Sequence, residues 1–487
     1  MRRFWVVLLA VFLMALPAMA DQVDGLASSS QSAPAQLQDL YVNPGGLGDV
    51  LVFPYYNART GLDYFRIVNT SDKGIIGKLR LREGKESKEV LDFIVCLSPH
   101  DEFTFWVVDP AVVGLTGNTA VVLRGNSGTG LMADTDTVVA PGGWTVAATR
   151  TITSGGQSID AARTFEGYVE FFALKAIAVA DSADFHSKIP DAAACLAAAK
   201  ATEGYEDAPN ALMGEAYIFN LNTLDSDGVS TYAYKAVAFA NFQDSPMAAG
   251  LTTDRPLFAD AKAGLMGVNY VLAKKDLYAF YDLQNYLQGQ TDLILNFVTK
   301  KENIDNGYAS IYYDSDKCVS ITAKVYDDKE NFPTSGVDFS PVPPGQKPRV
   351  CNEVTYLPVG SSSTILNTQL KELSVATSYQ LGWLQLSFDK GESTVGDFVA
   401  YGQPVLAYQL QSYFGGIAAD RMLPLSYEPE ISSSGEQQGG GQQGQGASTT
   451  INGVTVDCNT DCAATFGSDI VALTQCAAWQ SNNCQQQ

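Results

Sequence analysis

The sequence predicts a mostly β protein: antiparallel β-sandwich units of the Ig-like or jelly-roll type, a few short helices and a small cysteine-rich C-terminal module. Three observations support this fold class. Short runs alternate between apolar and polar residues, turn-forming residues separate these runs, and only 17% of the 487 residues are charged, too few for a disordered chain. Strands at such spacing are typical of sandwiches, and the length allows two or three domains.

The first twenty residues have the form of a secretory signal peptide. Two arginines precede a short apolar run at residues 4–16, and the A-M-A at residues 18–20 is a typical cleavage site. The run is too short for a bilayer span, which needs about 20 residues, so a membrane anchor is the weaker interpretation. Residues 21–40 are small and polar and indicate a flexible leader. We expect an exported protein, extracellular or at the cell surface, with the periplasm as the alternative.

Two β-rich units are expected, an N-terminal sandwich over residues 41–160 and a second unit over residues 161–428 packed on it. In the segment 77–82, two leucines point to one face and three basic residues to the other, as in a half-buried strand. The strands expected by the same reasoning are 49–56, 64–68, 77–82, 91–97, 103–107, 165–174, 211–220, 230–242, 293–298, 318–326, 350–357, 379–388 and 405–410.

Three helices are expected between and after these strands. Residues 191–200 are rich in alanine and follow Pro190, and residues 469–479 lie in the tail. In residues 275–288, apolar side chains recur at helical spacing and a glycine follows. The side chains that carry this last pattern are Leu277, Phe280, Tyr281 and Leu287.

The tail consists of a linker at residues 429–450, rich in Gly, Gln and Ser, and a module at residues 451–487. The module is too short to fold on apolar burial alone, so we expect disulfides among its four cysteines. Of the three pairings possible, the nested one is preferred, and a zinc site held by four thiolates is the weaker alternative. The nested pairing joins Cys458 to Cys484 and Cys462 to Cys476.

Four further cysteines lie in the body. Cys318 and Cys351 flank the Pro-rich segment FSPVPPG, so a disulfide that closes this loop is plausible in an exported protein. Cys96 and Cys195 pair only by elimination, and Cys96, in an apolar strand, could instead be a buried free thiol.

Six segments of the body have recognisable motifs: GDVLVFPYYNARTGLDYFRIVNTSD, KLRLREGKESKEVLDFIVCLSPHDEFTFWV, FEGYVEFFAL, GEAYIFNLNT, FSPVPPG followed by Cys351, and GQPVLAYQLQSYFGG. Together they resemble a family of exported bacterial β-sandwich proteins described only as hypothetical or cell-surface proteins. The resemblance covers residues 41–428 and implies export to the cell surface, but no activity, cofactor or catalytic residue. The linker, the tail and Cys96 look like additions to the family's pattern.

Candidate catalytic groups are few, because the chain has only two histidines. Ser98, His100 and Asp101 are too close in sequence to form a catalytic triad, since the three groups need separate supports. Glu166 and Glu170 share a strand face but lie ~13 Å apart, too far for a glycosidase pair, so a solvated strand face is the simpler interpretation. No nucleotide-binding loop or haem motif is present. We therefore expect no enzyme and no cofactor.

A weak calcium-binding motif lies at residues 222–228, where Asn222, Asp225 and Asp227 could supply oxygen ligands. The first and last positions of the EF-hand pattern are Thr223 and Tyr234 rather than acidic residues, so a hairpin turn is the favoured interpretation. Two weaker candidates of the same kind are the pairs Asp134/Asp136 and Asp314/Asp316.

The net charge of −22 argues against a partner that is a nucleic acid, because phosphates require clustered basic residues. Most strand aromatics are expected to pack in the core, and some could form a platform for sugars. The aromatics considered are Tyr55, Tyr56, Tyr64, Trp106, Tyr168, Tyr232, Tyr234, Trp383 and Tyr408.

The leading functional hypothesis is an exported, non-enzymatic structural or adhesive surface protein. A subunit of an extracellular fibre or matrix is one version of this hypothesis. Its partners would be other copies, other surface proteins or glycans, and it could form a homo-oligomer or filament. The alternative is a secreted protein that binds or cleaves carbohydrate. A calcium-stabilised surface-layer component is weaker still.

Overall fold

A computed structural model provides the structure of the chain. The expected signal peptide, nearly all of the leader, and the cysteines at 458, 462, 476 and 484 with the helix at 469–479 lie outside the residues that it describes. The described residues are 40–59, 61–125, 130–133, 135, 137–139, 144–149, 153–154, 157–158, 160–201, 204–225, 228–242, 264–329, 331, 339–343, 346–361, 363–395, 398–413, 418–425, 431–433, 448–451 and 454–457.

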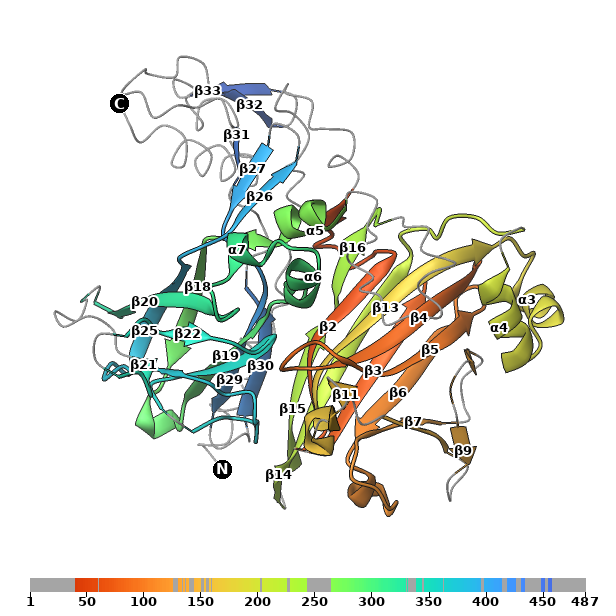
Figure 1. Cartoon of the computed structure of the whole chain (residues 1–487), viewed down its shortest axis with the longest axis horizontal. Coiled ribbons are helices and arrows are strands. Elements are labelled where there is room, and N and C mark those ends of the chain that lie inside the picture. The colour runs from red at the N-terminus through yellow and green to blue at the C-terminus, as the bar shows by residue number, and fades with distance from the viewer. Residues whose placement is uncertain are drawn as a thin grey trace, which may run out of the picture. The chain divides into compact units, whose positions relative to one another are not determined.

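The first sandwich contains the strands between residues 40 and 242, coloured red to light green in Figure 1. Sheet 1A has the order β1 (Tyr41–Val42), β16 (Val237–Ala240), β2 (Val50–Asn57), β13 (Glu166–Ile177), β4 (Gly74–Glu83), β5 (Glu89–Leu97), β8 (Leu131–Ala133). Sheet 1B has the order β15 (Gly228–Lys235), β14 (Leu212–Asp225), β3 (Gly61–Asn69), β6 (Glu102–Val108), β7 (Val121–Arg124), β10 (Thr145–Ala148), β9 (Thr137–Val139).

Alternate residues of the two sheets meet in the core of the first sandwich. Phe53 of β2 meets Phe65 of β3 edge to face at 5.3 Å, and Phe93 of β5 lies 6.1 Å from Phe103 of β6. All four rings are buried, as the period of two in the sequence requires.

The second sandwich contains the strands between residues 273 and 425, coloured green to blue. Sheet 2A has the order β21 (Phe339–Ser340), β24 (Ser374–Val375), β23 (Val354–Val359), β19 (Gln290–Asn296), β29 (Leu406–Tyr413), β30 (Ala418–Pro424), with β23 and β24 parallel. Sheet 2B has the order β18 (Asp276–Asp282), β25 (Leu381–Phe388), β20 (Val319–Asp327), β22 (Arg349–Val350).

Sheet 2A is buried on both faces. Leu293 and Leu357 pack towards sheet 2B, whereas Ile294, Tyr356 and Tyr408 belong to the core of the first sandwich. The layers therefore run from sheet 2B through sheet 2A to the first sandwich, and the core of the first sandwich extends onto one face of sheet 2A. A sheet with two buried faces explains why residues 291–296 of β19 are all buried, although only Leu293, Ile294 and Leu295 among them are apolar.

Short elements complete the description. The small sheets pair β11 (Thr153–Ser154) with β12 (Gln157–Ser158), β17 (Ala273–Lys274) with β28 (Gln403–Pro404), and β26 (Glu392–Val395) with β27 (Phe398–Tyr401) and β31 (Ile431–Ser433). The helices are η1 (Pro110–Val113), η2 (Ala161–Phe165), α3 (Ser182–Lys188), α4 (Ala192–Lys200), α5 (Gly264–Leu272), η4 (Asn285–Leu287), α6 (Lys300–Asp305) and α7 (Ala309–Tyr312). No helix among the described residues has the length and apolar character that crossing a bilayer requires.

The C-terminal residues 434–487 form a separate compact unit. Within it the structure describes one antiparallel hairpin, β32 (Ser448–Ile451) with β33 (Val454–Asp457).

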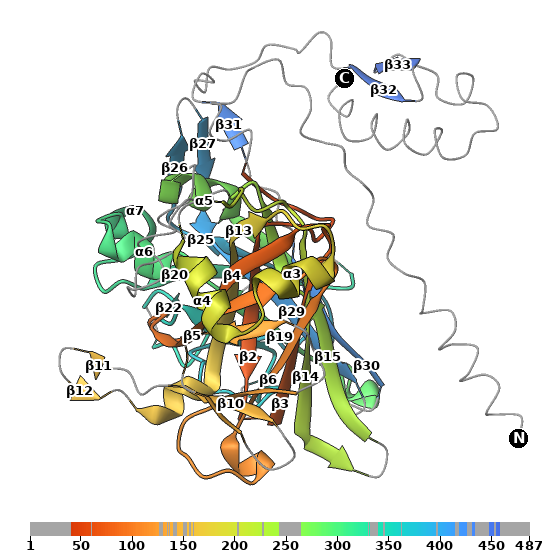
Figure 2. The ribbon, with the colours of Figure 1, turned by 90° about the vertical axis from the view of Figure 1, so that its right-hand side faces the viewer.

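The prediction of a mostly β, antiparallel protein with few helices is confirmed. Helix α4 is also confirmed, with Asp191 as its N-cap, accepting a hydrogen bond from the amide of Ala194 at 2.8 Å. Figure 2 shows α3 and α4 in front of β4, on the outer face of sheet 1A.

The helix expected over residues 275–288 is wrong. Residues 276–282 form β18, in which Leu277, Ala279 and Tyr281 are buried and alternate with outward side chains. The sequence fits both periods over so short a run, and pairing with β25 decides for the strand, which also suits its aromatic residues.

Two expected boundaries are also misplaced. The division at residue 160 cuts through one sandwich, because β13 lies between β2 and β4 in the middle of sheet 1A. The boundary between the two sandwiches along the chain lies between residues 242 and 264 instead. The expected linker from residue 429 begins too early, since Ile431–Ser433 pair with β27 through backbone groups that any composition supplies.

Two disulfides hold the body together. Cys96 of β5 is joined to Cys195 of α4, with 6.0 Å between their Cα atoms, and Cys318 is joined to Cys351 across the Pro-rich loop. Both pairs are those that the sequence suggested, and Cys96 is not a free thiol.

Candidate functional site

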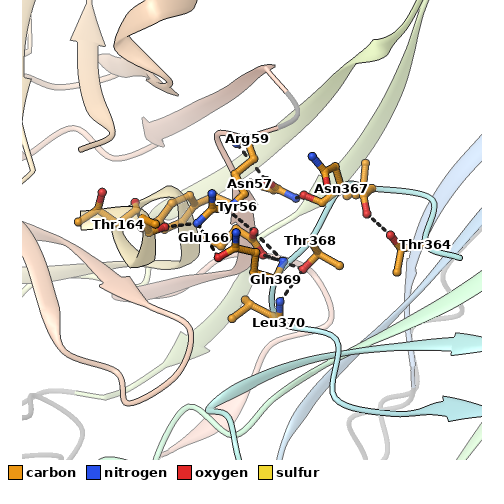
Figure 3. A network of polar contacts seen from close by, with 12 residues as sticks. Tyr56, Asn57, Arg59, Thr164, Glu166, Thr364, Asn367, Thr368, Gln369 and Leu370 are labelled. Carbon is orange, nitrogen blue, oxygen red and sulfur yellow. Dashed lines mark hydrogen bonds and ion pairs between the residues drawn. The ribbon is translucent and has the colours of Figure 1, made fainter. Parts of the chain in front are cut away.

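Glu166, one of the two paired carboxylates, lies in a buried polar network rather than on a solvated strand face (Figure 3). Arg59 contacts its carboxylate at 2.7 Å, Thr368 donates a hydrogen bond at 2.6 Å, and the Gln369 amide donates one at 2.9 Å. Burial raises the pKa of Glu166, and these three partners oppose the rise. Since Thr368 and Gln369 come from the second sandwich, this carboxylate fastens the two sandwiches together.

Glu170 is equally buried, and its role is also structural. Its carboxylate contacts the guanidinium of Arg82 at 2.8 Å, and neither side chain reaches solvent. The expectation of a solvated face is therefore wrong for both glutamates, because packing from distant parts of the chain covers them.

Glu170 belongs to a set of charges on the outer face of sheet 1A that we call the charge ladder. Its basic members alternate along β4, and each pairs with a carboxylate on β5 or β13. The pairs are Lys78–Asp92 at 2.6 Å, Arg80–Glu89 at 3.0 Å and Arg82–Glu170 at 2.8 Å.

Two more carboxyl groups of the second sandwich are buried nearby, Glu302 beside the ladder and Glu353 beside Glu302. Burial raises the pKa of Glu302 on α6 to about 7, against the opposing charge of Arg82. Burial likewise raises the pKa of Glu353. Neither carboxylate oxygen of Glu302 has a hydrogen-bond partner among the described residues. Both carboxyl groups are buried, so this region is closed to a substrate.

The remaining catalytic candidates do not form a site. His100 lies in an exposed turn with its Nε2 2.8 Å from Asp72, and Asp101 accepts a hydrogen bond from the backbone of Ser98. His186 is half-buried in α3. Among the described residues the Ser98 hydroxyl accepts a hydrogen bond from Ser182 at 3.1 Å, and none joins it to either histidine.

The calcium candidates lie only partly within the described residues, and the pair Asp134/Asp136 lies outside them. Asn222 and Asp225 lie on β14, in the hairpin with β15 that the sequence favoured, and Asp227 lies outside the described residues. Asp314 accepts a hydrogen bond from Ser320 and contacts Lys390. The described part of the chain holds no group of three residues able to bind a metal ion.

The outer face of sheet 2B carries a different kind of surface. Phe280 on β18, Trp383 on β25 and Tyr326 on β20 lie directly opposite one another across three adjacent strands. The rings of Trp383 and Tyr326 are stacked, with centroids 4.1 Å apart and an interplanar angle of 13°. Tyr278, two residues before Phe280, lies 6.3 Å from Trp383. We call these four residues the 2B row.

The 2B row is open to solvent. Phe280 is 75% exposed and Tyr278 is 57% exposed, while Trp383 and Tyr326 are half-buried by each other. Large aromatic side chains at such exposure are unusual on a folded protein and mark interaction surfaces.

Polar side chains continue the same face. Gln385 and Lys324 lie opposite each other, one step along the strands from the Trp383–Tyr326 stack. One step further, Ser387 donates a hydrogen bond to Asp276. Along the strands, the side chains of this face therefore change from aromatic rings to amide, ammonium, hydroxyl and carboxylate groups.

Local sequence explains how Trp383 reaches its stacking partner. Gly382 precedes it, and a Cβ at that position would lie 1.9 Å from the backbone oxygen of Tyr326. Only glycine permits β25 to approach β20 this closely. Gly382 therefore allows Trp383, the largest side chain of the 2B row, to reach its position beside Tyr326.

A second aromatic row lies on the outer face of sheet 1B. Tyr217 of β14, Tyr64 of β3 and Trp106 of β6 are directly opposite one another, with Tyr64 4.7 Å from Trp106 and 6.0 Å from Tyr217. Phe219 lies 5.7 Å from Trp106. These four half-buried residues are the 1B row.

Sequence reasoning found part of each row. It singled out Tyr64, Trp106 and Trp383 among the strand aromatics, whereas Tyr55 and Tyr168 of the same set are buried. It missed Phe280 by placing it on the core side of a helix. A signal was present, since Tyr278, Phe280 and Asp282 alternate with smaller or buried residues.

Comparison with known proteins gives no guide to this chain. No protein-family model, no curated protein and no solved structure matches it.

Proposed function

We propose that this chain is an exported, non-enzymatic adhesive protein of the cell surface or extracellular space, and that it binds glycans through the 2B row. The 2B row is the observation that carries the proposal. Its rings are exposed, aligned across three strands and continuous with hydrogen-bonding side chains. Binding sites combine apolar or aromatic surface with a few well-placed polar groups in this way.

A glycan suits both halves of the surface. The C–H faces of a sugar ring pack against the electron-rich faces of aromatic rings, and its hydroxyl groups exchange hydrogen bonds with amides and carboxylates. The groups next to the stack, Gln385 and Lys324, offer both donors and an acceptor. Three strands at about 4.8 Å spacing give a row about 10 Å long, enough for more than one ring.

Two other features support an extracellular setting. Disulfides persist in oxidising compartments, and two lie in the body of the chain. The net charge of −22 disfavours polyanionic partners and leaves neutral glycans as the better match.

A glycan array probed with the secreted full-length protein tests the proposal, followed by pull-down on insoluble cellulose and chitin. We expect Trp383→Ala to weaken binding about tenfold or more, because a lost stacking partner is worth about 1.4 kcal/mol. Trp144→Ala is the matched control, since Trp144 is 38% exposed but belongs to neither row. Absence of binding on every surface, or equal loss in both variants, would overturn the proposal.

Self-assembly is the second candidate, because β18 is an edge strand with exposed aromatic side chains. Such edges pair readily with a strand of another chain. Sedimentation velocity separates the two functions: an oligomer that Phe280→Ser dissociates would show that this face binds a second copy instead of a glycan.

A further inference from the structure

The 1B row repeats the design of the 2B row on the other sandwich. In both, aromatic residues occupy directly opposed positions on three adjacent strands of an outer sheet face. The opposite faces of the same strands carry the core, for example Phe65 on β3 and Phe105 on β6. The rings of the 1B row therefore do not belong to the core on the inner side of sheet 1B.

Polar groups again adjoin the rings. Arg66, two residues after Tyr64, is opposite Glu215 and Thr104 on the neighbouring strands. Its guanidinium contacts Glu102 at 2.7 Å and Glu215 at 3.3 Å, and all three side chains are well exposed. Paired carboxylate and guanidinium groups offer acceptors and donors side by side, which is what vicinal hydroxyl groups require.

Local charge narrows the class of ligand. One arginine stands between two carboxylates, so this surface carries no excess of positive charge. An anionic polymer would be repelled here as it would by the chain as a whole, whose net charge is −22. A neutral oligosaccharide fits the rings and the polar groups.

We infer that the 1B row is a second site for neutral glycans, held at a fixed distance from the 2B row. This inference rests on the proposed function. The fixed distance follows from the shared core, in which Tyr55 lies 5.9 Å from Tyr356 and Tyr234 lies 5.8 Å from Tyr408 across the two sandwiches. Two rigidly linked sites bind a polymer that reaches both with an avidity above that of either site.

Calorimetric titration with cellohexaose, chitohexaose and xylohexaose counts the sites. We expect two sites per chain in the wild type, one in Trp106→Ala, one in Trp383→Ala and none in the double variant. On the insoluble polymers, loss of either site should weaken retention, because one of two contacts with the polymer surface is lost. Trp144→Ala should keep both sites.

Trp106 also packs against Leu115 and a small apolar cluster, so its variant needs a second one beside it. Tyr217→Ala removes a ring at the other end of the 1B row, and unfolding curves of both variants report whether the fold is intact. Two sites retained in Tyr217→Ala and Trp106→Ala would overturn the inference.

The outcomes for the two proposals are distinguishable. A single wild-type site that Trp383→Ala abolishes keeps the proposed function and overturns the second site. A single site that Trp106→Ala abolishes keeps the 1B row as a site and removes the 2B row. No binding of any of the three oligosaccharides by the wild type overturns both.

Discussion

The outer faces of sheets 1A and 2B both carry rows of side chains across adjacent strands, but these rows differ in chemistry and in exposure to solvent. On sheet 1A the outward side chains include the charge ladder, of which Arg80, Arg82 and Glu170 are fully buried. On sheet 2B they are aromatic, yet Phe280 is three-quarters exposed. Buried charge and exposed aromatic surface are both costly unless a partner compensates them. The charge ladder has its partners within the chain, so the aromatic face is the one left for a partner from outside.

The largest expected effect comes from breaking the charge ladder. Arg82→Ala leaves Glu170 buried without its cation and should lower the free energy of unfolding by about 3–5 kcal/mol. Chemical denaturation measures this loss. Arg66→Ala, which breaks exposed ion pairs, should cost no more than about 1 kcal/mol. Equal losses in the two variants would mean that burial does not increase the contribution of the ladder's ion pairs to the free energy of unfolding.

The protonation of Glu302 should make stability depend on pH. Its pKa rises from 4.5 to about 7 on folding, so the folded state binds the proton more tightly. Stability from this group is full below pH 4.5 and falls as the pH rises through 7, by about 3 kcal/mol at most. The charges that act on it are those of Arg82, Glu170 and Lys301.

Glu302→Gln should remove that part of the pH dependence. Denaturation at pH 5 and pH 8 should give a smaller difference for the variant than for the wild type, with the variant the more stable at pH 8. Glu206→Gln, at an exposed ion pair, is the control. An unchanged slope in Glu302→Gln would show that this carboxyl group is not the titrating one.

Gly382→Ala should disturb the 2B row by changing how closely β25 approaches β20. The added methyl group would meet the backbone of Tyr326, and such overpacking costs about 1–3 kcal/mol. Near-ultraviolet circular dichroism should lose the signal of the stacked Trp383–Tyr326 pair. A variant with wild-type stability and spectrum would mean that β25 does not need this close approach.

The smallest effect on stability is expected at the most exposed ring. Phe280→Ser removes a side chain that is 75% exposed, so the free energy of unfolding should change by no more than about 0.5 kcal/mol. The midpoint of thermal unfolding measures this. A loss of several kcal/mol would assign Phe280 to the fold instead of to a binding surface.

Local alternation carried much of the fold prediction. The strands around Leu79, Phe93 and Phe103 follow from a period of two, because each has one face in the core. The same rule failed at β18, where Leu277, Tyr281 and Phe280 fit two periods at once and pairing with β25 decides. That error hid Tyr278 and Phe280, the two members of the 2B row on β18.

What joins the sandwiches could not be predicted, because it depends on contacts between distant residues. Glu166 meets Thr368 and Gln369 some 200 positions away, and Arg82 faces Glu302. A carboxylate on an alternating strand has the same local sequence whether water or another part of the chain covers it. The pairing of Cys96 with Cys195 was accessible only because few other cysteines were available.

Sheet 2A, with neither face open to solvent, also determines how the chain can be divided in the laboratory. A fragment that ends at residue 242 would uncover Tyr55 and Tyr234, and one that starts at residue 264 would uncover Ile294, Tyr356 and Tyr408. Each piece would present a wide apolar surface and would tend to aggregate. Despite its two sandwiches, the chain up to Ser433 is one compact unit, so we expect it to be expressed and engineered whole.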